Sequence, residues 1–277
     1  MNRILVVGAN GTVGSELVKL LTQAGEEVLS ATSKTPTDRA QIHLDLTTGA
    51  GLEQAFAGVD RAFFMAPPGF VKQNEILAPL IEQAAKNKLR RVVLQTAMGT
   101  NSADANPMRI AELQLERSGV SYNILRPNWF MQNFNSYWIE GILTAGAIRL
   151  PVSDARTSFI DARDIAASAA ALLLGDAHRN QAFDLTGAEP LTHTQVAAML
   201  SETTGKAIRF EDITPAQMLQ QLLDAGLPEP YAQFLVVILG VMKEGHAARI
   251  TDAVETITGR APIRFAQYVR DYQSAWA

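Results

Sequence analysis

The stretch Ile4-Leu5-Val6-Val7-Gly8-Ala9-Asn10-Gly11-Thr12-Val13-Gly14 decides the fold of this chain. Its four apolar residues predict a short buried strand, and three glycines follow, each separated from the next by two residues. Glycines let a backbone turn sharply and approach a ligand closely, and the helix expected after them offers free N–H groups. Because strand and helix flank the glycines, they predict a dinucleotide-binding turn rather than an ordinary tight turn. The cofactor-binding residues expected here are Gly8, Asn10, Gly11, Thr12, Val13 and Gly14.

Strand-like apolar runs alternate with helical patterns through the first 130 residues. The helix after the glycines has one apolar face, and Gly25 ends it. Further strands are expected at residues 27–31, 42–44, 61–65, 92–95 and 122–125, with helices at 52–56, 74–87 and 108–118. These strands are apolar throughout, which is typical of a parallel sheet covered on both faces. The chain is therefore predicted to be an α/β protein with a Rossmann-type, doubly wound parallel sheet.

The second half of the chain has a different pattern. A short strand is expected at 158–160, a helix from Asp161 to Leu174 with Asp161 as N-cap, and a return strand at 182–185. Helices are then expected at 192–204, 215–225, 228–243 and 252–258. We predict a single domain over residues 1–277, with a cofactor-binding core at 1–150, return elements at 151–187 and a smaller, mostly helical substrate cap at 188–277.

Composition excludes several classes of site. The net charge is −4 without a Lys/Arg block, so nucleic acid is not an expected partner. The absence of cysteine rules out disulfides and thiolate chemistry, and the four scattered histidines lack the paired spacing of a zinc site, so no metal is expected. The start of the chain does not resemble a signal peptide, and the longest apolar stretch, residues 234–242, is too short to span a membrane. We expect a cytoplasmic protein. The run 234–239 is expected to pack in the core by default, with a lid over a pocket or a dimer contact as alternatives.

The end of the second strand bears on the choice of cofactor. A site for NAD usually has an acidic residue there, but this segment contains Ser33 and Lys34, which suit a ribose 2′-phosphate. The pair favours NADP(H) over NAD(H), although Lys34 is also interpretable as an ordinary surface lysine. After the third strand, Asp45 is placed to reach adenine with Leu46 against the ring; a turn or N-cap role for Asp45 is an equal alternative. The remaining expected cofactor residues are Ala66, Pro67, Thr96, Ala97 and Pro127.

With these residues in place, the chain resembles the NmrA-like family of atypical short-chain dehydrogenases/reductases. The matching stretches are the glycine loop, Glu116-Arg117-Ser118-Gly119-Val120, Leu125-Arg126-Pro127-Asn128-Trp129-Phe130-Met131-Gln132-Asn133, Phe159–Ala166 and Thr258–Pro262. Within the family it most resembles the reductases of triphenylmethane dyes and quinones, and festuclavine dehydrogenase-like proteins. The resemblance implies a Rossmann core, NADP(H) binding and hydride delivery to small conjugated, often aromatic acceptors.

The catalytic Tyr-x-x-x-Lys pair of the wider superfamily is missing from the chain. Its nearest form, from Tyr122 to Arg126, falls on an expected strand and is interpreted as structural. The helix that should carry the pair contains Arg109 and Glu112, which can pair with each other or form a solvated face. We therefore assign no catalytic residue. A site without such an acid suits acceptors that stabilise the incoming charge themselves.

Such a site would hold the acceptor by stacking, for which aromatic and Met side chains are suited. The candidates are Met98, Trp129, Phe130 and Met131, of which at least one of the last three is expected in the core. We predict an NADPH-dependent oxidoreductase that reduces a quinone, an azo or triphenylmethane dye, or an iminium compound, as a monomer or homodimer. The alternative is an NADP-binding, redox-sensing regulator without turnover that docks a protein partner. A sugar-nucleotide epimerase shares the fold but depends on the missing Tyr/Lys pair.

Overall fold

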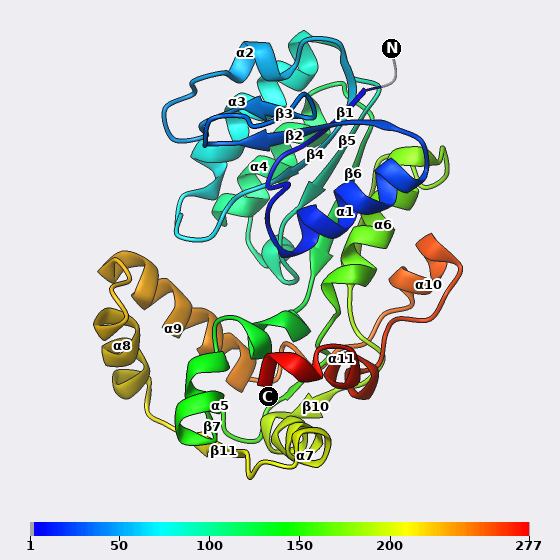
Figure 1. Cartoon of the computed structure of the whole chain (residues 1–277). Coiled ribbons are helices and arrows are strands. Elements are labelled where there is room, and N and C mark those ends of the chain that lie inside the picture. Colours follow the sequence, from blue (N-terminus) through cyan, green and yellow to red (C-terminus); the bar gives the residue numbers. More distant parts are fainter. Residues whose placement is uncertain (1–2, 277) are drawn as a thin grey trace. The chain divides into compact units, whose positions relative to one another are not determined.

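The computed structural model describes residues 3–276 (Figure 1). The chain forms two compact units, each assembled from three separate segments. Unit 1 contains residues 3–127, Ala162–Leu185 and Ala253–Gly259; unit 2 contains Asn128–Asp161, Thr186–Asp252 and residues 260–276. This division differs from the expected one, because residues 128–150 belong to unit 2 and residues 253–259 belong to unit 1.

Unit 1 is built on a seven-stranded sheet, in the part of the chain that is described, and all of its strand pairs are parallel. The strand order is β3-β2-β1-β4-β5-β6-β9. The strands are β1 (Arg3–Val6), β2 (Glu27–Thr32), β3 (Gln41–His43), β4 (Val59–Met65), β5 (Arg91–Gln95), β6 (Tyr122–Pro127) and β9 (Gln181–Leu185). The predicted Rossmann-type fold is confirmed, and the expected return strand joins the same sheet beside β6.

Helices cover both faces of this sheet. On one face α1 (Thr12–Gln23) packs along α6 (Ala162–Leu174), which also contacts α10 (Ala253–Thr258). The other face is covered by α2 (Leu52–Ala55), α3 (Gln73–Lys86) and α4 (Pro107–Arg117), and the 3₁₀ helix η1 (Thr100–Ser102) precedes α4. Phe63 and Phe64 are neighbours on β4, point to opposite faces and are both fully buried. Covering both faces explains why the strands are apolar throughout.

The strand register brings several loops to one edge of the sheet. Met65 on β4 pairs with Gln95 on β5, and Gln95 pairs with Leu125 on β6. Val6 on β1 pairs with Phe63 on β4, two residues before that strand ends. Because parallel strands all end at the same edge, the glycine loop and the connections after β4, β5 and β6 leave the sheet together. The strand order reverses between β1 and β4, which is the position where open α/β sheets bind ligands.

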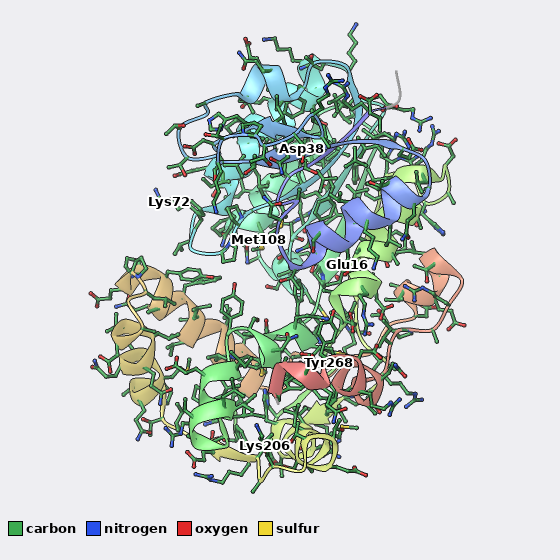
Figure 2. The ribbon with its side chains drawn as sticks, viewed as in Figure 1. Glu16, Asp38, Lys72, Met108, Lys206 and Tyr268 are labelled. Carbon is green, nitrogen blue, oxygen red and sulfur yellow. The ribbon has the colours of Figure 1, made fainter. Side chains whose placement is uncertain are left out.

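Unit 2 has an aromatic core surrounded by short elements. Trp276, Tyr268, Phe265, Phe159 and Phe134 are fully buried in it, and Figure 2 marks Tyr268. Its helices are α5 (Ile139–Ala145), α7 (His193–Thr204), α8 (Pro215–Asp224), α9 (Glu229–Lys243) and α11 (Phe265–Asp271), with 3₁₀ helices η2 (Met131–Asn135) and η3 (Gln273–Trp276). Its strands are β7 (Ala147–Leu150) paired with β11 (Arg209–Asp212), and β8 (Arg156–Thr157) paired with β10 (Leu191–Thr192).

Sequence signals locate some of these elements well and others poorly. Capping boxes begin α7 at Thr192 and α8 at Thr214, close to the expected starts. The strand expected at 158–160 is wrong: β8 ends at Thr157, and Ile160 forms only an isolated bridge with Phe130. The Ser158 N–H donates instead to the Ala247 carbonyl at 2.9 Å, and Ala247 belongs to no named strand.

The apolar helix α9 also departs from its expected role. Only Ala232, Leu239 and Met242 of its fifteen residues are buried, so core packing does not account for its apolar sequence. No helix within residues 3–276 has the length and apolar character that crossing a membrane requires.

Candidate functional site

The glycine loop after β1 is closely packed against its own backbone. Gly8 has a φ of +78°, and a Cβ there would lie 2.6 Å from the Met65 sulfur. A Cβ on Gly14 would lie 2.0 Å from the Gly8 carbonyl oxygen, which is far inside van der Waals contact. The Gly11 N–H donates to that same carbonyl at 2.9 Å and closes the turn. Gly8, through its positive φ, and Gly14, through its close approach to a backbone carbonyl, therefore depend on the absence of a side chain.

This turn delivers the chain to the N-terminus of α1. Gly11 is the N-cap and offers no side-chain cap, and the first turn contains no acidic residue. The first N–H groups of a helix have no partner within it, and the helix dipole makes this end positive. Above Gly11 a Cβ would meet only the Gly8 carbonyl, at 3.2 Å. The residues present thus fit a pyrophosphate, whose oxygens would accept hydrogen bonds from the free N–H groups of Thr12, Val13 and Gly14.

The expected residues after β4, β5 and β6 lie at the same sheet edge as the glycine loop. Ala66 and Pro67 follow β4 directly and are half-buried. The Thr96 N–H donates to the Leu125 carbonyl at 2.9 Å, and the Met98 N–H donates to the Pro127 carbonyl at 3.0 Å. These bonds hold the segment of Thr96, Ala97 and Met98 beside the end of β6. The structure therefore brings together the predicted residues of these three strand ends.

At the end of β2, Ser33 and Lys34 are exposed, as a phosphate-binding role requires. The Lys34 N–H donates to the Thr32 hydroxyl at 3.2 Å, which fixes the start of the loop. Within residues 3–276 the Lys34 ammonium has no ion pair. Arg39, in the same connection to β3, is also exposed and without an ion pair among the described residues. The backbone of Arg39 lies away from the end of β2, because β3 begins opposite Ser30 and the Ser30 N–H donates to the Ala40 carbonyl at 2.7 Å.

Asp45 has its carboxylate engaged in a turn. Its Oδ1 accepts from the Thr47 N–H at 2.8 Å and from the Thr48 N–H at 3.3 Å. Hydrogen bonds from Thr47 and Thr48 hold the pKa of Asp45 below its usual value. Leu46 packs against the core on the α2–α4 side of the sheet. A contact of either residue with adenine stays a prediction.

Behind Thr96 lies a buried ionic cluster. Glu112 on α4 is fully buried, and its carboxylate accepts the Thr96 hydroxyl at 2.7 Å. Arg126 on β6 donates to both Glu112 oxygens, at 2.9 and 2.7 Å. Arg109 donates to Glu112 at 2.9 Å and to Glu116 at 2.7 Å. The expectation that Arg109 and Glu112 form a solvated face is wrong, because α4 turns Glu112 under the end of β5; their pairing is confirmed.

The cluster determines the protonation state of Glu112. Burial pushes the pKa of this carboxyl upward, but hydrogen bonds from Arg126, Thr96 and Arg109 outweigh burial and hold the pKa below its usual value. Glu112 is therefore ionised at neutral pH and has no proton to donate. The Thr96 hydroxyl points its own hydrogen at Glu112, so it faces a ligand only as an acceptor.

The three consecutive acceptor candidates lie in unit 2 and differ in exposure. Met131 is 1% exposed and belongs to the core, so contact with an acceptor is not supported for it. Trp129 and Phe130 are half-buried. The Trp129 ring stacks on Trp138 with centroids 6.1 Å apart. The expectation that at least one of the three belongs to the core is confirmed for Met131.

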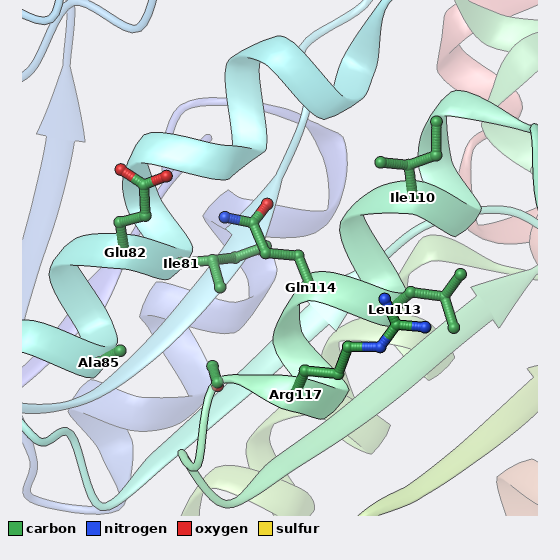
Figure 3. Close-up of a pocket in the computed structure, with 8 residues that line it drawn as sticks. Ile81, Glu82, Ala85, Ile110, Leu113, Gln114 and Arg117 are labelled. Atoms are coloured by element: carbon green, nitrogen blue, oxygen red, sulfur yellow. The ribbon is translucent and has the colours of Figure 1, made fainter.

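A separate groove of about 620 Å³ lies between α3 and α4. Figure 3 shows Glu82 on α3 and Ile110, Leu113 and Arg117 on α4 around it. It contains none of the residues expected to bind cofactor or acceptor.

Comparison with known proteins shows the family of the chain. The model of the NmrA-like family matches residues 1–261. The chain belongs to the NmrA-like family. It is 32% identical to the NAD(P)H azoreductase of Xenophilus azovorans over 99% of both chains.

Two solved structures share the fold of this NmrA-like protein. One is the NADPH-dependent quinone oxidoreductase of Escherichia coli complexed with NADPH, with a TM-score of 0.84, 19% identity and coverage of 97% of this chain and 99% of that one. The other is the Citrobacter triphenylmethane reductase complexed with NADP(H), with a TM-score of 0.82, 20% identity and coverage of 97% and 99%.

Proposed function

We propose that this NmrA-like protein is an NADPH-dependent oxidoreductase that reduces a small conjugated acceptor by direct hydride transfer, without a protein acid. The acceptor is a quinone, an azo or triphenylmethane dye, or an iminium compound. The ionised Glu112 cluster carries the proposal. Glu112 lies on α4, the helix expected to carry the Tyr-x-x-x-Lys pair of the wider superfamily. Its ionised carboxylate has no proton to donate.

The proposed cofactor contacts follow from the sheet edge. The glycine loop and the N-terminus of α1 bind the pyrophosphate, and Ser33 and Lys34 bind the 2′-phosphate. The exposed Lys34 ammonium and the absence of an acidic residue in the segment 30–34 support a preference for NADP(H) over NAD(H). When bound, NADPH supplies a hydride, which is a proton with two electrons.

The chemistry of the acceptor makes a protein acid unnecessary. A triarylmethane or iminium cation is neutralised by the hydride and needs no proton. A quinone takes the hydride to give a delocalised hydroquinone anion, which then takes a proton from water. An isolated ketone would form an alkoxide, which does require an acid in the site. The chain's own contribution is to bind and orient the acceptor and to exclude water.

Steady-state NADPH oxidation across a panel of acceptors tests the proposal. We expect turnover of 1,4-benzoquinone and malachite green, and none of a simple ketone such as cyclohexanone. No turnover of any quinone, dye or iminium compound overturns the proposal. In that case, unequal affinity for NADP⁺ and NADPH together with a bound protein partner would support the redox-sensing regulator. Light scattering on the same samples decides between monomer and homodimer.

A further inference from the structure

The α9 helix of unit 2 has an exposed apolar face. With 100° of rotation per residue, Phe234, Val237 and Val241 lie opposite the buried Ala232 and Leu239. Val237 is 64% exposed and Val241 is 46% exposed. An exposed apolar face of this kind usually marks a binding surface.

Aromatic side chains extend this face at the beginning of the helix. The Tyr231 and Phe234 rings stack with centroids 6.1 Å apart and planes 24° from parallel. Tyr137, which follows η2, is 70% exposed. Desolvation of its phenol and the neighbouring Tyr231 both raise the pKa of Tyr137. Two elements distant in sequence thus contribute to one aromatic surface.

The electrostatics of the face are equally distinctive. Between Glu229 and Lys243 the helix contains no acidic or basic residue. The π faces of Tyr and Phe carry negative potential, which attracts cations and repels anions. The surface therefore complements a ligand that is uncharged or carries a delocalised positive charge.

The size of the face indicates a small ligand rather than a protein. From Tyr231 to Val241 the helix rises about 15 Å at 1.5 Å per residue, which matches a molecule of two or three aromatic rings. A stable protein interface needs about 800 Å² on each partner from some 20 to 30 residues. Five side chains supply much less than that.

We propose that Tyr137, Tyr231, Phe234, Val237 and Val241 form the acceptor-binding face of unit 2, and that it selects multi-ring acceptors that are uncharged or cationic over anionic ones. The inference rests on the proposed function and extends it, since it names residues and a charge preference. Neither the tyrosines nor the valines belong to the sequence-predicted site.

A pair of charge variants at Val237 tests this proposal. This side chain is exposed, so Val237→Lys and Val237→Glu should both fold. The acceptors are malachite green, a cationic triarylmethane, and light green SF, a sulfonated dye of the same framework. Lysine should lower kcat/KM for the cationic dye relative to the anionic one by roughly three- to tenfold, and glutamate should raise that ratio. A folding defect cannot produce opposite shifts.

Phe234→Ala measures the stacking contribution. We expect KM for malachite green to rise roughly threefold to tenfold, with little change for the single ring of 1,4-benzoquinone. Ile110→Lys and Ile110→Glu, at an apolar position of α4 that is 41% exposed, control for the change in net charge.

The outcomes separate this inference from the proposed function. Two results overturn the inference alone, provided that the protein turns over 1,4-benzoquinone. One is that the two Val237 variants do not shift the ratio of kcat/KM for the two dyes in opposite directions, and the other is that the Ile110 variants shift it equally. No turnover of any acceptor by the unmodified protein overturns the proposed function; binding of malachite green to the unmodified protein and both Val237 variants, measured by equilibrium dialysis, then still decides the inference. A fall in molar mass on Val237→Lys would show that a second copy covers the face, which also overturns the inference.

Discussion

His193 is a fully buried imidazole among aromatic rings in unit 2. It lies edge-on to Phe159 with ring centroids 5.4 Å apart, and neither ring nitrogen has a hydrogen-bond partner within residues 3–276. Burial disfavours the imidazolium and lowers the pKa of His193 to about 3. The ring therefore acts as an apolar core residue at neutral pH, and acid destabilises the folded state because the buried ring resists protonation.

We expect His193 to make unit 2 less stable in acid. Between about pH 6.5 and pH 3 the unfolded chain binds a proton here that the folded chain does not, so stability falls as pH falls, by up to about 1.4 kcal/mol per pH unit. Urea unfolding of the wild type and of His193→Phe across this range measures the effect. As the pH falls, the free energy of unfolding of the wild type should decrease relative to that of His193→Phe. Parallel pH profiles for the two proteins would contradict the lowered pKa of His193.

Glu112 is the residue on which the ionic cluster depends. Glu112→Gln leaves the buried Arg126 guanidinium without its ionised partner on α4, and breaking a buried ion pair costs about 3–5 kcal/mol. Urea unfolding at pH 7 should show a loss of this size. The matched variant Glu116→Gln, at a more exposed carboxylate of the same helix, should lose less than about 1 kcal/mol. Equal losses for the two variants would show that burial of Glu112 is not decisive.

Removing the single charge of Lys34 tests the preference for NADP(H). Lys34→Ala should weaken NADPH binding about tenfold, because one charge-assisted contact with a phosphate is lost, and should leave NADH binding nearly unchanged. Isothermal titration with both cofactors measures this, with the exposed Lys72→Ala as the control. Equal weakening of NADPH and NADH would remove Lys34 from the 2′-phosphate site.

At the scale of elements, β1, the glycine loop and α1 work as one unit. The loop holds the helix N-terminus at the sheet edge because Gly14 approaches the Gly8 carbonyl more closely than any side chain allows. Other helices of the fold have the same dipole, but α1 follows β1 at the point where the strand order of the sheet reverses. The combination therefore matters more than any one glycine.

Gly14→Ala should separate α1 from the loop. Its Cβ would lie 2.0 Å from a backbone oxygen, so the backbone must move, and we expect NADPH affinity to fall at least tenfold. Fluorescence titration with NADPH measures it. Ser15→Ala, at an exposed position of the same helix, is the control and should bind normally. Normal affinity of Gly14→Ala would mean that the pyrophosphate lies elsewhere.

At the scale of the whole molecule, the chain crosses between its two units several times. Unit 1 takes α6 and β9 from residues 162–185 and α10 from residues 253–259. Its first 127 residues therefore lack the helix that packs along α1 and the strand that pairs with β6. No single cut leaves either unit complete in the described chain.

A fragment of residues 1–150 should consequently fail to fold as a cofactor-binding domain. It exposes the apolar face of α1, leaves β6 as an open edge, and carries part of the unit 2 core without the rest. We expect no cooperative thermal transition by circular dichroism and no NADPH binding, in contrast to the full chain. A cooperative transition with full NADPH affinity would show that the first 150 residues are independent.

The sequence by itself determined the parallel α/β fold, the dinucleotide-binding loop and the lack of a Tyr/Lys pair. These depend on local patterns, since a strand, a glycine turn and an amphipathic helix can each be predicted from neighbouring residues. Only the tertiary structure decided that Glu112 is buried against Arg126 and that α9 leaves Val237 exposed. Helical periodicity shows that a face is apolar or charged, but not which distant segment packs against it, and that packing sets both the burial of Glu112 and the exposure of α9.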